Sequence, residues 1–168
     1  KAFEEGWVKP FLAGKQTGKR VGVIGSGPAG LAAAQNLARA GHEVVVIERQ
    51  EKPGGLLRYG IPDFKLEKHV IDRRVEQLEA EGVEFQCGVT AGQDISVRYL
   101  RKRFDGILLA MGAEQPRDLD AEGRDKENIL YAMDFLTVQN KIVGGESLEG
   151  YKMVSAQDKT VVVIGGGD

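Results

Sequence analysis

The sequence predicts an α/β protein in which a parallel sheet carries helices on its faces. Short apolar runs of strand length alternate along the chain with amphipathic helical patterns, an order typical of parallel sheets. A glycine-rich turn joins the first apolar run to the first helical pattern, and the second apolar run ends in an acidic residue. A near copy of the first strand and turn stands at the other end of the chain. The length of 168 residues suits one domain with a sizeable core.

The first unit begins with an apolar strand over residues 21–24, which leads into Gly25, Gly27 and Gly30. These glycines have the GxGxxG spacing of a phosphate-binding turn that opens a helix. The first permits the tight turn, the second lets the backbone approach a pyrophosphate, and the third lets helix and strand pack closely. A side chain at the second position would therefore collide with a bound phosphate group.

The helix after this turn presents small residues toward the sheet and ends at Gly41, and a second strand follows over 44–48. The strand closes with Glu48, whose carboxylate can accept hydrogen bonds from ribose hydroxyls. Taken alone, the turn could be a solvated loop and Glu48 a surface acid. Because strand, turn, helix, second strand and acid stand in register, the run predicts a Rossmann-like dinucleotide-binding unit.

The rest of the chain continues the alternation. The elements expected after the second strand are a helix over 67–81, a strand over 83–89, a helix over 96–104, a strand over 106–110 and a short helix near 132–136. Residues 144–159 are expected to form a linker. Residues 1–19 should form a short amphipathic helix and a linker, with Trp7 as a packing anchor.

Composition argues against several functions. Lys and Arg total 23 against 25 for Asp and Glu, so the net charge of −2 gives no electrostatic case for nucleic acid or an anionic membrane. No apolar run approaches a membrane span, and a cytoplasmic location is the default expectation. The single cysteine, Cys87, reads as a buried strand thiol. It leaves no internal disulfide and no metal or iron–sulfur site built from this chain's own thiolates. Because the chain begins at Lys1, we expect it to be processed or part of something longer.

The last nine residues, TVVVIGGGD, read as a strand entering a second glycine turn, with Gly165 and Gly167 in GxG spacing. A hairpin turn is the alternative for this short stretch. Its match to RVGVIGSG near the other end favours a second dinucleotide-binding unit, inside which the sequence ends. The expected organisation is therefore an N-terminal segment over 1–19, a dinucleotide-binding domain over 20–159 and the start of a second one over 160–168.

Two such units in one chain, the first closing in an acid, resemble the two-dinucleotide-binding-domain flavoproteins. Four segments sharpen the resemblance to the glutamate synthase NADPH small (beta) subunit family: PGGLLRYGIPDFKLEK, ILLAMGAEQPRDL, VVVIGGGD and AFEEGWVKP. The family's cysteine-rich iron–sulfur domain, most of its NADPH domain and the segment that completes the FAD domain are not in this sequence. DAEG at 120–123 also replaces a more apolar stretch expected from the family.

The resemblance implies that FAD occupies the first unit and NADPH mainly the second, with electrons passing from NADPH through FAD to iron–sulfur centres of an upstream domain. A glutamate synthase large subunit, or a similar acceptor protein, would be the partner. No catalytic side chain is expected, because hydride transfer between the two cofactors needs proximity and orientation more than an acid–base pair. We expect the chain alone to hold FAD at most, and not to turn over NADPH.

The resemblance also implies positions for the cofactor. Glu48 would bind the adenosine ribose, the backbone of Val89 would meet the adenine, and Arg58 would meet phosphate or ring oxygens unless it is a surface charge. The pyrophosphate cradle would comprise Gly25, Ser26, Gly27, Pro28, Ala29 and Gly30. The segment along the flavin would comprise Gly55, Leu56, Arg58, Gly60 and Ile61, and the turn closing over the cofactor Ala110, Met111 and Gly112. Gly165 and Gly167 would belong to the phosphate turn of the NADPH unit.

Two alternatives remain open on the residues alone. A simple NAD-dependent dehydrogenase domain could use Glu48 to bind the NAD ribose, although it would need neither the GGLLRYGIP segment nor a second glycine turn. A non-catalytic nucleotide-binding module could keep the same fold without redox chemistry.

Overall fold

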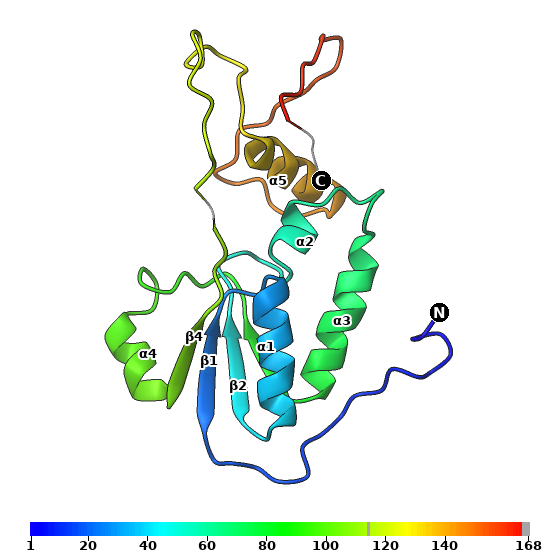
Figure 1. Ribbon diagram of the computed structural model, residues 1–168, viewed down its shortest axis with the longest axis vertical. Helices are drawn as coiled ribbons and strands as arrows, with labels where there is room; N and C mark the ends of the chain where they lie inside the picture. The colour runs from blue at the N-terminus through cyan, green and yellow to red at the C-terminus, as the bar shows by residue number, and fades with distance from the viewer. Residues whose placement is uncertain (114, 166–168) are drawn as a thin grey trace.

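The computed structural model describes residues 1–113 and 115–165, and its centre is a four-stranded parallel sheet (Figure 1). The strands are β1 (Arg20–Ile24), β2 (Glu43–Ile47), β3 (Val83–Gln86) and β4 (Gly106–Leu109), in the order β3-β2-β1-β4. All three pairings are parallel, with Val21 opposite Val44 on one side and Gly106 on the other. The predicted α/β fold with a parallel sheet is confirmed.

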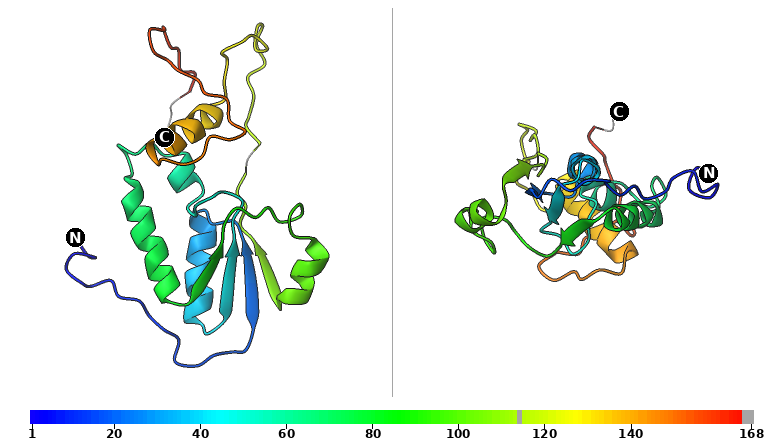
Figure 2. Two further views of the ribbon diagram at one scale, coloured as in Figure 1. Left: turned by 180° about the vertical axis from the view of Figure 1, so that it is seen from behind. Right: turned by 90° about the horizontal axis from the view of Figure 1, so that it is seen from below.

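The helices are α1 (Pro28–Arg39), α2 (Leu56–Tyr59), α3 (Lys68–Ala80), α4 (Val97–Arg103) and α5 (Ala132–Val143). The helices α1 and α3 pack on the same side of the sheet, whereas α4 lies beside β4 at the opposite edge of the molecule from α3 (Figures 1 and 2). Beyond the carboxyl ends of the strands lie α2 and α5, which contact each other.

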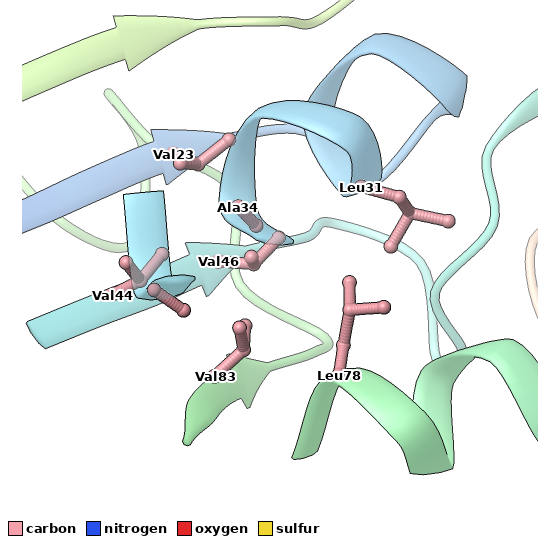
Figure 3. Packing of buried hydrophobic residues seen from close by; sticks show 8 residues of the cluster. Val23, Leu31, Ala34, Val44, Val46, Leu78 and Val83 are labelled. Carbon is pink, nitrogen blue, oxygen red and sulfur yellow. The ribbon is translucent and has the colours of Figure 1, made fainter. Parts of the chain in front are cut away.

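Alternating strand residues build a core on each face of the sheet. Val23, Val44 and Val46 point toward α1 and α3 (Figure 3). The side chains that meet them there include Leu31, Ala34, Leu78 and Val83. On the other face, Ile24, Val45 and Ile47 pack against Leu100 and Phe104 at α4. Each such buried aliphatic side chain stabilises the fold by about 1.5–3 kcal/mol.

A buried carboxylate ties the two helices of the first face together. Glu81, which caps the end of α3, accepts hydrogen bonds from Arg39 Nε and an Arg39 terminal nitrogen, at 2.8 and 2.7 Å. It also accepts from Gln35 at 3.0 Å and Gln77 at 2.8 Å. Burial by itself raises the pKa of Glu81, but the hydrogen bonds from Arg39, Gln77 and Gln35 outweigh it and lower the pKa to about 2.

The strand order positions the candidate site. The chain builds the sheet outward from β1 to β3, and then crosses back to place β4 on the other side of β1. Such a reversal is the topological switch point at which open α/β sheets bind ligands, outside the carboxyl ends of the strands. The glycine turn follows β1 and therefore stands at this point.

The structure corrects several predicted elements. Residues 2–6 form turns rather than a helix, and Trp7 is 71% exposed, so its predicted role as a packing anchor is wrong. The contacts to the helices come instead from Phe3, which lies under the Arg73 guanidinium, and Phe11, which lies near that of Arg39. Cys87 lies just past the end of β3 and is only half-buried.

Three further differences concern length and pairing. The strands β3 and β4 end at Gln86 and Leu109, earlier than the predicted 89 and 110. The helix α5 extends well past the predicted 132–136, to Val143. The sequence pattern gave no sign of α2. Residues 160–165 form neither strand nor helix, because a strand needs a neighbouring strand for its backbone hydrogen bonds. The apolar side chains of 161–164 are exposed. A second dinucleotide-binding unit beginning there stays a prediction, and Gly167 lies outside the described residues.

Candidate functional site at the carboxyl edge of the sheet

Two of the three turn glycines are required by the protein's own packing. Gly25 has φ +101°, and a Cβ there would lie 2.5 Å from the carbonyl oxygen of Ala110. A Cβ on Gly30 would lie 2.0 Å from the carbonyl oxygen of Gly25. The first and third glycines therefore let the turn, the start of α1 and the segment after β4 pack against one another, as the motif predicts.

Gly27 differs from both, because nothing in the described structure requires it to be glycine. Its φ of −64° suits any residue, and a Cβ there would meet no protein atom within 4 Å. Gly27 is the N-cap of α1, and no side chain caps this helix. The space beside Gly27 is therefore open at the positive end of a helix.

The first turn of α1 leaves backbone donors for a ligand. Pro28 has no N–H, and the N–H groups of Ala29 and Gly30 donate to no backbone carbonyl of the described chain. The first such donor is Leu31, whose N–H bonds to the carbonyl of Gly27 at 2.9 Å. Unpaired N–H groups at a helix N-terminus form a site for a phosphate or another anion.

Glu48 is buried at the end of β2, with 6% of its surface exposed, so the alternative of a surface acid is wrong. Its Oε2 accepts a hydrogen bond from the Ser26 N–H at 3.0 Å and one from the Ser26 hydroxyl at 2.5 Å. Its Oε1 accepts from the Gln50 N–H at 2.8 Å. The backbone of Glu48 also accepts from the Val89 N–H at 3.0 Å, which places Val89 beside it.

The segment before α2 packs directly on the glycine turn. The Gly54 N–H donates to the Ser26 hydroxyl at 3.0 Å. Gly55 has φ +52°, and a Cβ there would lie 2.7 Å from the Cα of Gly27. Glycine at position 55 is therefore needed for this close approach, and the predicted flavin segment starts in contact with the predicted pyrophosphate cradle.

Arg58 does not lie on the surface. It is 4% exposed, and its Nε donates to the carbonyl of Pro53 at 2.6 Å while a terminal nitrogen pairs with Asp72 of α3 at 2.5 Å. The guanidinium thus fixes the turn before α2 to α3. The surface-charge alternative is wrong, and a contact between Arg58 and a cofactor stays a prediction.

The other predicted residues line the same edge to different degrees. Leu56 is 57% exposed and Met111 is exposed, whereas Gly60 and Ile61 are half-buried at the end of α2. After β4, the Ala110 N–H bonds to the carbonyl of Ile24, and Gly112 has φ +72°. Gly165 makes no such contact with this edge, but its φ of +101° equals that of Gly25.

Sequence reasoning missed a buried polar cluster that joins α2 to α5. The Tyr59 hydroxyl donates to Glu146 at 2.8 Å, and Lys141, 2% exposed, lies 3.4 Å from the same carboxylate. The Lys141 ammonium faces the rings of Tyr59 and Tyr151 at 5.3 and 5.2 Å. Burial and the bond to Glu146 raise the pKa of the Tyr59 hydroxyl. Two features of the sequence could have indicated this cluster. Tyr59 lies within the GGLLRYGIP segment, and Lys141 lies among the apolar residues of α5.

The described residues contain neither a helix long and apolar enough to cross a membrane nor a group of three side chains arranged to hold a metal ion. The edge presents backbone N–H groups, one buried carboxylate and glycines, and these are groups that bind phosphate and ribose.

A sequence profile decides the family. The profile of the pyridine nucleotide-disulphide oxidoreductases matches residues 19–168, which include the whole sheet and the glycine turn. The chain belongs to the pyridine nucleotide-disulphide oxidoreductase family. The match extends through the glycine-rich residues at the end of the sequence.

Among individual proteins, the relatives of this chain include glutamate synthase chains. The chain is 52% identical over 171 aligned residues to the glutamate synthase [NADPH] small chain of Mycobacterium tuberculosis (strain CDC 1551 / Oshkosh), covering all of this chain and 35% of the relative. It is 48% identical to the glutamate synthase [NADH] of Schizosaccharomyces pombe, covering all of this chain and 8% of the relative. The chain thus spans about a third of the length of the small chain that it matches.

A solved structure supports the same fold. The chain superimposes on Mycobacterium tuberculosis FprA in complex with NADPH with a TM-score of 0.66 and 26% identity, over 73% of this chain and 29% of FprA. The resemblance to the glutamate synthase small subunit and the oxidoreductase fold, both predicted from the sequence, are confirmed.

Proposed function

We propose that this chain binds FAD at the carboxyl edge of its sheet, as the FAD-binding part of an NAD(P)H-dependent flavoprotein oxidoreductase of the glutamate synthase small-subunit type. The observation that carries the proposal is the open space at Gly27, beside unpaired N–H groups of Ala29 and Gly30. A glycine that the protein's own packing does not need is explained by a ligand that occupies the place of its side chain.

The residues at this edge fit the parts of FAD. The cradle from Gly25 to Gly30 would hold the pyrophosphate through N–H groups and the positive helix end, and Glu48 would accept a hydrogen bond from the adenosine ribose. Val89 and the turn from Ala110 to Gly112 would border the adenine and close over the cofactor. The segment from Gly55 to Ile61 would lie along the flavin, and bound FAD would supply the redox chemistry.

The electron route extends this proposal beyond the described chain. Electrons would pass from NAD(P)H through FAD to iron–sulfur centres of an upstream domain and on to a large subunit or similar acceptor. The second glycine turn would begin the NAD(P)H domain, with Gly165 and Gly167 in its phosphate turn. The similarity to glutamate synthase chains supports this route, and because those relatives are named for NADPH and for NADH, the proposal extends to both coenzymes.

The colour of the purified protein tests the cofactor. A yellow preparation that releases FAD on denaturation is expected. A colourless protein that takes up NAD but not added FAD would instead support the NAD-dependent dehydrogenase, and one that binds neither would contradict a nucleotide site altogether.

Gly27→Val tests the place of the pyrophosphate. A Cβ at Gly27 would meet no protein atom within 4 Å, so the variant should keep its circular dichroism spectrum but lose FAD binding. Gly14→Val is the matched control, because a Cβ at Gly14 also meets nothing within 4 Å, in a segment far from the edge. Full FAD occupancy in Gly27→Val would show that the pyrophosphate does not lie on this turn.

A further inference from the structure

The Ser26 side chain lies at the junction of three segments of the site. It is completely buried, its hydroxyl donates to Glu48 Oε2 at 2.5 Å, and it accepts from the Gly54 N–H at 3.0 Å. The Ser26 N–H donates to the same carboxylate oxygen at 3.0 Å. One residue of the glycine turn thus holds both the end of β2 and the segment before α2.

The two oxygens of the Glu48 carboxylate accept different numbers of hydrogen bonds. Each carboxylate oxygen accepts about two hydrogen bonds. Oε2 receives two, both from Ser26, whereas Oε1 receives one, from the Gln50 N–H at 2.8 Å. Among the described residues, no Lys, Arg or His side chain forms an ion pair with Glu48. Oε1 therefore keeps a place for one further donor.

We infer that Ser26 is a positioning residue for nucleotide binding, which acts through its side chain on Glu48 and Gly54. By engaging Oε2 fully, the hydroxyl orients the carboxylate so that Oε1 faces the one remaining donor, a ribose hydroxyl. By accepting from the Gly54 N–H, it also holds Gly55 against Gly27. This inference rests on the proposed function and adds a role that the backbone of the glycine turn cannot perform.

The arrangement also implies what the site rejects. A phosphate ester at the ribose would bring a second anion against a buried carboxylate that no described cation neutralises. A ribose without hydroxyl groups would leave Oε1 with an unmet acceptor. The site should therefore favour nucleotides whose adenosine ribose carries free hydroxyls, and this preference should depend on Ser26.

Ser26→Ala tests the inference by titration with FAD, ADP and 2′,3′-dideoxy-ADP. Because Ser26→Ala leaves Glu48 in place but fixes it less firmly, the affinity for FAD should fall by no more than in Glu48→Ala, about 5- to 30-fold. The preference of the wild type for ADP over dideoxy-ADP should shrink, because Oε2 of the carboxylate keeps only the Ser26 N–H of its two donors and is fixed less firmly. Ser155→Ala removes an exposed serine hydroxyl and should change neither value.

A double-mutant cycle separates this role from a general loss of structure. If Ser26 acts on ribose through Glu48, Ser26→Ala should not alter the ratio of ADP to dideoxy-ADP affinity in a Glu48→Ala background. Amide hydrogen exchange of the nucleotide-free protein should be faster at Gly54 in Ser26→Ala than in the wild type, because the N–H loses its acceptor.

The outcomes distinguish the two levels of the proposal. Wild-type protein that binds neither FAD nor ADP would overturn the proposed function and this inference with it. Wild-type protein that binds FAD, together with a Ser26→Ala variant of unchanged affinity and ribose preference, would overturn the inference alone. The inference would also be overturned if Ser26→Ala changed the ratio of ADP to dideoxy-ADP affinity equally in the wild-type and Glu48→Ala backgrounds.

Discussion

Glu48 and Glu81 are both buried carboxylates, exposed by 6% and 4%, yet their partners are opposite in kind. Glu81 receives a two-pronged bond from Arg39 and further bonds from Gln35 and Gln77. Among the described residues, Glu48 receives only uncharged donors, from Ser26 and Gln50. The carboxylate with a cation and a full set of donors joins two helices, whereas the one at the edge of the sheet keeps an acceptor for a ligand. Burial alone does not separate a structural acid from a binding one, but the count and charge of its donors do.

The largest expected effect is on stability, in Glu81→Gln. The amide cannot accept the paired bonds of Arg39, and it brings a new donor against those of Gln35 and Gln77. Urea unfolding should show a loss of about 3 kcal/mol. FAD affinity, measured where both proteins are folded, should stay within twofold of the wild type. A Glu81→Gln variant that folds normally but has lost FAD binding would contradict a purely structural role for Glu81.

The second prediction concerns acid. Because the pKa of Glu81 is lowered to about 2 from its ordinary value of 4.5, its contribution to stability is fully present above pH 4.5 and is lost as the pH falls toward 2. Between pH 5 and pH 3 this group should cost the fold about 2 kcal/mol. Denaturant titrations across this window should show the loss in the wild type and not in Glu81→Gln. Parallel curves would exclude Glu81 as the source.

The smallest effect is expected on affinity, in Glu48→Ala. Among the described residues, Oε1 accepts one hydrogen bond and can accept one more, from the ribose. Glu48→Ala removes that bond, so FAD binding should weaken by about 1 to 2 kcal/mol. Calorimetric or fluorescence titration with FAD measures it, with Glu84→Ala, an exposed acid of β3, as the control. Unchanged affinity would remove Glu48 from the site.

The sheet and the turn were predictable because their signals are local. Strand alternation over 21–24 and 44–48 and the spacing of Gly25, Gly27 and Gly30 are encoded within one short run, and the structure forms the strands and the turn there. The same run also gave the position of Glu48, though its role at the ribose stays a prediction.

What the sequence did not reveal depends on contacts between distant residues. Arg58 could be a surface charge or a ligand on pattern alone, and only the fold brings Asp72 to it. The helical pattern over α3 does not show either that Arg74 donates to Gln35 of α1. The bond from Tyr59 to Glu146 joins residues 87 positions apart, across a stretch with weak periodicity. Short motifs carry no information on such partners.

The cluster of Tyr59, Lys141 and Glu146 has a consequence for the order in which the protein is made. The segment from Gly55 to Ile61 is held on one side by the glycine turn, which is synthesised early, and on the other by α5, which is synthesised more than 70 residues later. Domains generally fold as units while the chain is synthesised. The segment from Gly55 to Ile61 is therefore held on both sides only once Glu146 has been synthesised, and a cofactor bound before then would lack that support.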